Sequence, residues 1–189
     1  MNPSAVLLAG GESRRMGTDK ARIIFRGKPL WKIQLALLRK LDPLEVFVSA
    51  RTDPEWRPED VQFVADNPPS RGPLSGLAAA LAEMRSTHLL AIAIDMPFMS
   101  ESYLRFLWQE IEPGCGVLPK IDSRFEPLAA IYPREVDVDF RKALSSADFS
   151  LQTLTSRLVE AGKLRTISVA DGETKLFVNL NEPADVQSA

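Results

Sequence analysis

The sequence of 189 residues contains one cysteine, Cys115, and one histidine, His88. A single cysteine excludes a disulfide within the chain and a cysteine-rich zinc site, and we expect the one histidine to lack the partners that a metal site or a triad needs. We expect Cys115 to be a small core residue, with a lone nucleophile as the alternative, and His88 to lie at the edge of a strand. So little cysteine is typical of a reducing compartment.

Long hydrophobic runs and a strong net charge are also missing. The first apolar run, Ala5–Ala9, is short, follows no basic segment and ends at two glycines, so it does not resemble a secretory signal. No stretch approaches the length of a transmembrane helix. A net charge of −2 provides no global basic field for nucleic acid. We therefore predict a cytoplasmic protein with neither membrane nor nucleic acid as a partner.

The first half of the chain alternates between two patterns. Short apolar runs predict buried strands, and stretches with an apolar residue every three or four positions predict helices. This alternation indicates right-handed crossovers and a largely parallel sheet. In the first helix, Leu30, Ile33, Leu37 and Leu41 form the expected buried face. The expected strands are Ala5–Ala9, Val46–Val48, Val61–Ala65 and Leu89–Ile94, and the expected helices start around Pro29, Pro73 and Ser100.

The second half has a different pattern. Two apolar runs, Val117–Pro119 and Leu128–Tyr132, flank a polar segment, which predicts a hairpin or an excursion into a mixed sheet. No repeat, low-complexity segment or change of composition marks a linker, so we expect one α/β domain over residues 1–189. The last expected elements are helices over Val136–Leu144 and Leu151–Ala161 and a strand over Leu164–Val169.

The segment after the first strand combines glycines with cations. Ligands of open parallel sheets bind beyond the carboxyl ends of the strands. Gly10 and Gly11 let backbone N–H groups approach phosphate oxygens, and cations can neutralise the phosphates. The segment fits neither a Walker A loop nor a dinucleotide fingerprint. It predicts a polyanion site, with a basic surface loop as the alternative. The four cations are Arg14, Arg15, Lys20 and Arg22.

Two carboxylates follow other predicted strands. Asp95 ends the most apolar strand, where an unpaired charge is costly, and a Mg²⁺ bridging it to a triphosphate would compensate. The alternative is a structural role before Pro97. Asp66 precedes the segment Arg71–Gly76, which begins a helix, and a carboxylate can accept two hydrogen bonds from guanine N1–H and its amino group. The alternative is that this segment, with its neighbouring prolines, is only a connecting loop.

The segment Leu8–Ala21, LAGGESRRMGTDKA, resembles the signature loop of the molybdenum cofactor guanylyltransferases, within the nucleotidyltransferase superfamily. Five further motifs follow in the order of that family, so the resemblance covers most of the chain. They are GKPLW at Gly27–Trp31, RGPLSGL at Arg71–Leu77, DMPF at Asp95–Phe98, EPLAAIY at Glu126–Tyr132 and FVNLNEPAD at Phe177–Asp185.

The resemblance implies a fold and a reaction. The fold is a single three-layer α/β/α domain with a mostly parallel, Rossmann-like sheet, of the nucleotide-diphospho-sugar transferase type. The reaction transfers GMP from GTP to the phosphate of molybdopterin, with Mg²⁺ as cofactor and pyrophosphate as the second product. Transient contacts with other cofactor-biosynthesis proteins and acceptor apo-enzymes are also implied.

The resemblance further implies residue roles. Lys20 and Asp95 are the expected catalytic residues, Lys20 on the triphosphate and Asp95 as the magnesium ligand, while Asp66 is expected to read guanine. Many members have an asparagine that contacts the nucleotide at the position of Ser49. The resemblance therefore implies that Ser49 makes this contact here. Lys120 and Arg124 are the cationic candidates for the pterin phosphate. The remaining expected contacts are Leu8, Ala9, Gly10, Gly11 and Arg15 for the nucleotide, and Asn179 and Asn181 for the pterin.

Two other functions fit parts of this pattern. A sister enzyme that transfers cytidylyl to the same pterin usually has Ala-Ala-Gly where this chain has Ala9-Gly10-Gly11, and it favours acids over the pair Asn179 and Asn181. Both features favour guanylyl transfer. A catalytically silent nucleotide-binding carrier of the cofactor is the other alternative. A sugar-phosphate relative would keep the loop and the acid of the DMPF motif but differ in the second half.

Overall fold

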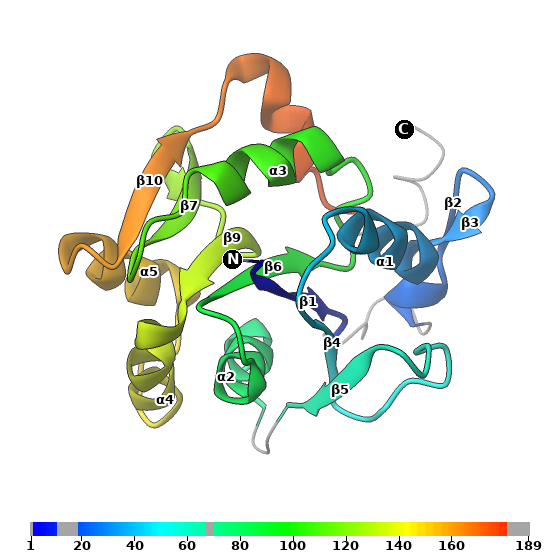
Figure 1. Ribbon diagram of the computed structural model, residues 1–189, viewed down its shortest axis with the longest axis horizontal. Helices are drawn as coiled ribbons and strands as arrows, with labels where there is room; N and C mark the ends of the chain where they lie inside the picture. The colour runs from blue at the N-terminus through cyan, green and yellow to red at the C-terminus, as the bar shows by residue number, and fades with distance from the viewer. Residues whose placement is uncertain (1, 11–18, 67–69, 181–189) are drawn as a thin grey trace.

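The computed structural model describes residues 2–10, 19–66 and 70–180. Its centre is a sheet in the strand order β10-β7-β9-β6-β1-β4-β5, with the short β8 paired to β7. Helices cover both faces of this sheet (Figure 1). The predicted three-layer α/β/α fold is confirmed.

One half of the sheet is parallel, as predicted. β1 pairs in parallel with both β4 and β6, and β4 pairs in parallel with β5. The register places Leu8 opposite both Ser49 and Ala93, so three strands end at the same level. The strands of this half are β1 (Ser4–Leu8), β4 (Val46–Ala50), β5 (Gln62–Ala65) and β6 (His88–Ala93).

The other half is mixed, as the polar interruption predicted. β9 runs antiparallel to both β6 and β7, while β10 is parallel to β7. β7 and β8 form a hairpin whose turn contains Asp122 at a φ of 52°, a left-handed conformation that aspartate tolerates. The strands are β7 (Gly116–Ile121), β8 (Arg124–Phe125), β9 (Ala129–Pro133) and β10 (Leu164–Ser168).

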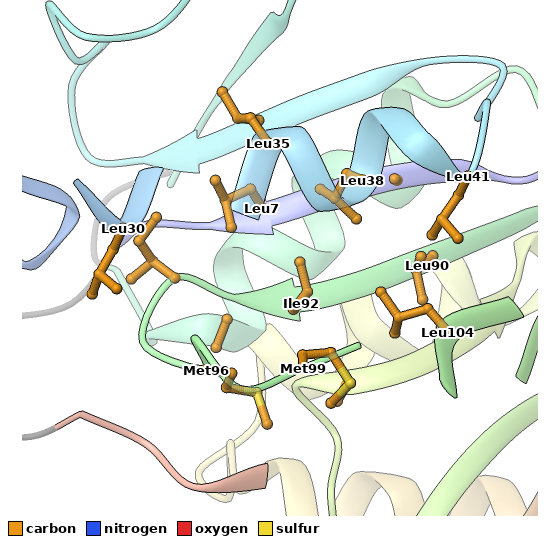
Figure 2. Close-up of a cluster of buried hydrophobic side chains, with 14 of the residues drawn as sticks. Leu7, Leu30, Leu35, Leu38, Leu41, Leu90, Ile92, Met96, Met99 and Leu104 are labelled. Carbon is orange, nitrogen blue, oxygen red and sulfur yellow. The ribbon is translucent and has the colours of Figure 1, made fainter. Parts of the chain in front are cut away.

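Each face of the sheet has its own hydrophobic core. α1 (Leu30–Lys40) and α3 (Glu101–Gln109) pack on one face, where leucine, isoleucine and methionine side chains interdigitate (Figure 2). α2 (Pro73–Glu83), α4 (Asp137–Leu144) and α5 (Leu151–Glu160) contribute to the core on the other face. Of the helices described, none is both long enough and apolar enough to span a membrane.

Short elements connect these layers, and the sequence pattern did not predict them. A two-stranded hairpin precedes α1, and its turn uses Arg26 and Gly27 at positive φ. The short elements are η1 (Lys20–Arg22), β2 (Ile24–Phe25), β3 (Lys28–Pro29), η2 (Arg134–Val136) and η3 (Asp171–Phe177).

The predicted buried face of the first helix is confirmed at Leu30 and Leu41 but not at the two positions between them. Ile33 and Leu37 are only partly buried, whereas Leu35, Leu38 and the polar Gln34 are buried. The apolar period missed this face because Gln34 belongs to it: its amide nitrogen donates to the Met96 carbonyl at 2.7 Å. The backbone carbonyl thus satisfies the amide nitrogen of Gln34, whereas its Oε1 is buried without a hydrogen-bond partner in the described part of the chain.

The single histidine and the single cysteine differ in burial: His88 is buried and Cys115 is partly exposed. His88 begins the central strand β6 and is buried, with Nδ1 3.0 Å from Thr87 Oγ1 and Nε2 3.1 Å from the Glu112 carbonyl oxygen. Cys115 is partly exposed, so its predicted place in the core is wrong. The reason is local: Cys115 lies in the turn before β7, where it forms an isolated bridge with Glu112.

Candidate active site

Polar groups gather at the edge of the sheet where the parallel strands have their carboxyl ends. Because β1, β4, β5 and β6 are parallel, the residues after their carboxyl ends share this edge. Backbone hydrogen bonds continue the pairing past the strands: Ala9 N donates to the Ser49 carbonyl at 2.9 Å, and Asp66 N donates to the Ala50 carbonyl at 3.0 Å. The nucleotide-binding residues predicted from three separate motifs therefore come together.

A lysine and a carboxylate form an ion pair at this edge. Lys20 Nζ lies 2.9 Å from Asp95 Oδ2, with side-chain exposures of 26% and 17%. Asp19 caps the short helix η1 by accepting a hydrogen bond from Ala21 N at 3.0 Å. Its other carboxylate oxygen accepts from Trp56 Nε1 at 2.9 Å. Asp19 thus fixes the backbone from which Lys20 reaches Asp95.

The loop that carries Asp95 is fixed on three sides. Ile94 N donates to the Leu8 carbonyl at 3.1 Å, which ties the loop to β1. Leu180 N donates to the Asp95 carbonyl at 2.8 Å, and Gln34 holds the next carbonyl, that of Met96. The sequence did not identify Gln34 or Leu180. A glutamine among the leucines of a buried helix is the one signal that pointed to Gln34.

A second carboxylate, Asp66, lies against the backbone of the signature loop. Ser49 Oγ donates to Asp66 Oδ1 at 2.7 Å, and both side chains are buried. A Cβ atom on Gly10 would lie only 2.6 Å from Asp66 Oδ2. Burial raises the pKa of Asp66, although the hydrogen bond from Ser49 and the charge of Arg51 act in the opposite direction. Within the described residues, Ser49 is the only donor bonded to this carboxylate.

The helix after the RGPLSGL motif approaches the same edge closely. A Cβ atom on Gly76 would lie 2.2 Å from Ser49 Oγ and 3.0 Å from Leu8 Cδ2, so only glycine fits. The start of the helix is held by Ser75 Oγ, which accepts from Arg71 N at 2.8 Å. α2 therefore packs its first turns directly behind Ser49. The RGPLSGL motif is visible in the sequence, but the need for Gly76 depends on a contact between distant segments.

Other predicted residues lie elsewhere. Arg22 forms an exposed ion pair with Glu55 at 2.9 Å, so it is not part of the cationic group beside Asp95. Asn179 is exposed and directly precedes Leu180, which bonds to the Asp95 carbonyl. Lys120 lies with Nζ 5.8 Å from the centre of the Phe125 ring. The predicted contacts of Gly11, Arg14, Arg15 and Asn181 lie outside the described residues.

The donor set around Asp95 fits one kind of metal site. Across residues 2–10, 19–66 and 70–180, no three histidine, cysteine, aspartate or glutamate side chains are grouped for a metal. A protein cage for calcium or zinc is therefore not formed by these residues. A single carboxylate such as Asp95 fits Mg²⁺, which commonly takes one or two carboxylates and completes its shell with phosphate oxygens and water.

Comparisons with known proteins identify the family of the chain. A probable molybdenum cofactor guanylyltransferase from Opitutus terrae is 33% identical, over 96% of this chain and 92% of that protein. The structure of molybdopterin-guanine dinucleotide biosynthesis protein A from Archaeoglobus fulgidus is similar with a TM-score of 0.78 and 27% identity, covering 98% and 95% of the two chains. The model of the MobA-like NTP transferase domain matches residues 5–161, and the chain belongs to this family.

Proposed function

We propose that this protein transfers the guanylyl group of GTP to the phosphate of molybdopterin. The observation that carries the proposal is the 2.9 Å pair of Lys20 and Asp95 at the carboxyl edge of the sheet, in a chain of this family. The relatives reported above are named for this activity or for this product. The arrangement supplies a cation and a metal-binding carboxylate at one place, which is what transfer of a nucleotidyl group requires.

Asp66 is the proposed reader of the base. A carboxylate accepts hydrogen bonds only, and guanine offers two adjacent donors, N1–H and the 2-amino group. Cytosine offers one donor, its 4-amino group, beside acceptors that a carboxylate would repel. Ser49 occupies one oxygen of Asp66, and the other oxygen, against Gly10, has no protein donor in the described part of the chain. Asp66 therefore favours GTP over CTP.

The chemistry needs positioning and charge neutralisation rather than a strong base. The acceptor phosphate is already an anion, so its oxygen can attack the α-phosphorus of GTP without first losing a proton. The new P–O bond forms as the bond between the α-phosphorus and the pyrophosphate oxygen breaks. Lys20 would neutralise charge on the triphosphate, and Asp95 would hold Mg²⁺, which supplies further positive charge when bound.

We also propose a cytoplasmic location, because a chain with one cysteine suits a reducing compartment. The product would then pass to acceptor apo-enzymes through transient contacts. These two points follow from the cysteine content and from the reaction itself. They do not depend on the geometry of the site.

Titration calorimetry with GTP and with CTP, each with Mg²⁺, tests the base preference. An assay of pyrophosphate release with molybdopterin then tests the transfer. We expect tighter binding of GTP and release of pyrophosphate only when GTP and molybdopterin are both present. Preference for CTP would favour the cytidylyl alternative, and GTP binding without pyrophosphate release would favour the silent carrier.

A further inference from the structure

Glu126 belongs to the EPLAAIY motif and has no part in the site described so far. It lies between β8 and β9, and β9 is the neighbour of β6 in the sheet. The carbonyl of Leu128 accepts a hydrogen bond from Ala93 N at 3.0 Å, and Ala93 lies two residues before Asp95. The turn that contains Glu126 is therefore attached to the same edge of the sheet as Asp95.

The backbone on both sides of Glu126 is held by specific hydrogen bonds. The Gln152 side chain from α5 donates to the Phe125 carbonyl at 2.8 Å and accepts from Phe125 N at 3.3 Å. Glu126 N donates to the Pro119 carbonyl at 2.9 Å. The segment is thus joined both to a helix and to the adjacent strand β7.

The residue after Glu126 is held as firmly. The carbonyl of Pro127 accepts a hydrogen bond from Tyr132 OH at 2.7 Å. Tyr132 is fully buried, and its ring packs edge-on against Phe140 at 5.3 Å between centroids. A buried hydroxyl with one well-placed acceptor fixes that acceptor in turn. The backbone from Phe125 to Leu128 is therefore a rigid support for a single carboxylate.

The carboxylate on this support has no protein partner among the described residues. No hydrogen bond or ion pair reaches it, although the side chain is partly buried. Burial raises the pKa of Glu126, and the charge of Arg124 lowers it by less. Partial burial disfavours the charged form of a carboxylate when no protein donor compensates for the lost water. Such a group is expected where a ligand supplies the hydrogen bonds.

The order of the strands places Asp95 between Glu126 and a second carboxylate, Asp66, which accepts one hydrogen bond from Ser49. Asp95 follows β6, Glu126 precedes β9 on one side of it, and Asp66 follows β5 on the other side. The proposed guanylyl transfer joins two molecules that each carry a 2-amino-4-oxopyrimidine ring. One ring is in guanine and the other is in the pterin. Each ring presents a ring N–H next to an amino group, which is the donor pair that a carboxylate accepts.

We propose that Glu126 determines specificity for the acceptor by accepting hydrogen bonds from the ring N–H and 2-amino group of its pterin. This inference rests on the proposed function and deepens it. One carboxylate on each side of Asp95 then orients one ring, and the reacting phosphates meet between them. Glu126 acts on the binding of the acceptor and leaves the binding of GTP unchanged.

Steady-state kinetics of Glu126→Gln separate this role from a structural one. Glutamine has the same shape, but its NH₂ group opposes the donors of the ring. We expect KM for molybdopterin to rise about tenfold, since hydrogen bonds to charged groups contribute on that order. KM for GTP and the melting temperature should stay as in the wild type. Glu59→Gln, at an exposed carboxylate, is the matched control and should change neither KM.

Binding of two small pteridines gives a second readout that is independent of turnover. Pterin has the 2-amino group, and lumazine has an oxygen in its place. We expect the wild type and Glu59→Gln to bind pterin about tenfold more tightly than lumazine, and Glu126→Gln to lose this preference. Equal binding of both pteridines by the wild type would overturn the inference.

The failure of this inference is distinguishable from failure of the proposed function. If the wild type releases pyrophosphate from GTP and molybdopterin while Glu126→Gln keeps both wild-type KM values, the role of Glu126 is refuted and the proposed function stands. If the wild type binds GTP and releases no pyrophosphate with molybdopterin, the proposed function fails, and this inference fails with it.

Discussion

The two ends of the parallel strands treat their buried carboxylates differently. At the amino end, Glu45 precedes β4 and accepts hydrogen bonds from Ser4 Oγ at 2.9 Å, from Arg85 N at 2.8 Å and from Arg85 Nε at 2.7 Å. At the carboxyl end, Asp66 accepts one hydrogen bond, from Ser49, within the described residues. At the amino end, protein donors satisfy the buried carboxylate of Glu45. At the carboxyl end, the carboxylate of Asp66 can accept further hydrogen bonds.

The pKa values of these two carboxyl groups shift in opposite directions. Burial alone would raise the pKa of Glu45, but the backbone and side chain of Arg85 and the hydroxyl of Ser4 together lower it below its ordinary value. For Asp66, burial outweighs the hydrogen bond from Ser49 and the charge of Arg51. A carboxylate stabilised by the fold contributes to stability, whereas one left undersatisfied is available to a ligand.

The largest expected effect concerns catalysis at the carboxyl end. Replacing Lys20 or Asp95 by alanine removes a charge that would act on the transferring phosphates. Each change should reduce kcat/KM for GTP roughly a hundredfold, or about 3 kcal/mol, as is usual for one electrostatic group in a site that excludes water. Pyrophosphate release under saturating molybdopterin measures the effect.

The matched control for this pair is Lys32→Ala, at an exposed lysine on α1. It should leave kcat/KM unchanged, and all three variants should keep a cooperative melting transition. Turnover near the wild-type rate in both Lys20→Ala and Asp95→Ala would refute their assigned roles.

The next effect concerns stability at the amino end. Glu45→Ala removes the acceptor of four hydrogen bonds, the fourth from Gln62 Nε2 at 3.4 Å, and leaves the Ser4 hydroxyl buried without this partner. We expect the free energy of unfolding to fall by about 2–3 kcal/mol, since unsatisfied buried donors are costly. Urea denaturation measures it, and kcat below the melting temperature should not change. A loss of activity with unchanged stability would reverse the comparison between the two ends.

The sequence predicted the carboxyl end much better than the amino end. Gly10, Asp66 and Asp95 each directly follow an apolar run, so strand prediction and parallel pairing were enough to bring them together. Glu45 depends on partners 40 and 41 residues away in sequence. No local pattern marks them, because the register of the folded sheet selects them.

The same reasoning explains which parts of the fold were missed. Apolar period identified the long helices but assigned Ile33 and Leu37 to the buried face of α1. Gln34 lies on the buried face because its side chain donates to the Met96 carbonyl. This hydrogen bond joins two segments that are far apart in the sequence. Periodicity records hydrophobicity along one element. It does not record a polar side chain whose amide nitrogen donates to a distant backbone carbonyl.

A smaller effect is expected at the base-reading carboxylate. Asp66→Asn replaces an acceptor by a group that donates toward guanine N1–H and its amino group. The affinity for GTP should fall roughly tenfold to thirtyfold, or about 1–2 kcal/mol, while CTP binding should change less. Stability should not fall, because the substitution also removes a buried charge. Calorimetric titrations with both nucleotides and a thermal melt check the two parts. Equal losses for GTP and CTP would show that Asp66 does not read the base.

The smallest effect is a pair of pH dependences with opposite signs. The pKa of Glu45 is lowered by folding, so its stabilisation is present above the pKa of the unfolded chain and is lost as pH falls through the folded value. The pKa of Asp66 is raised by folding, so its contribution is present at low pH and is lost as pH rises through the folded value. Glu45→Gln should therefore flatten the acid-side loss of stability, and Asp66→Asn should steepen it. Unfolding free energies of both variants and the wild type, measured from neutral to acidic pH, compare the slopes. If both substitutions changed the slope relative to the wild type in the same direction, the two ends of the sheet would hold their carboxylates in the same way.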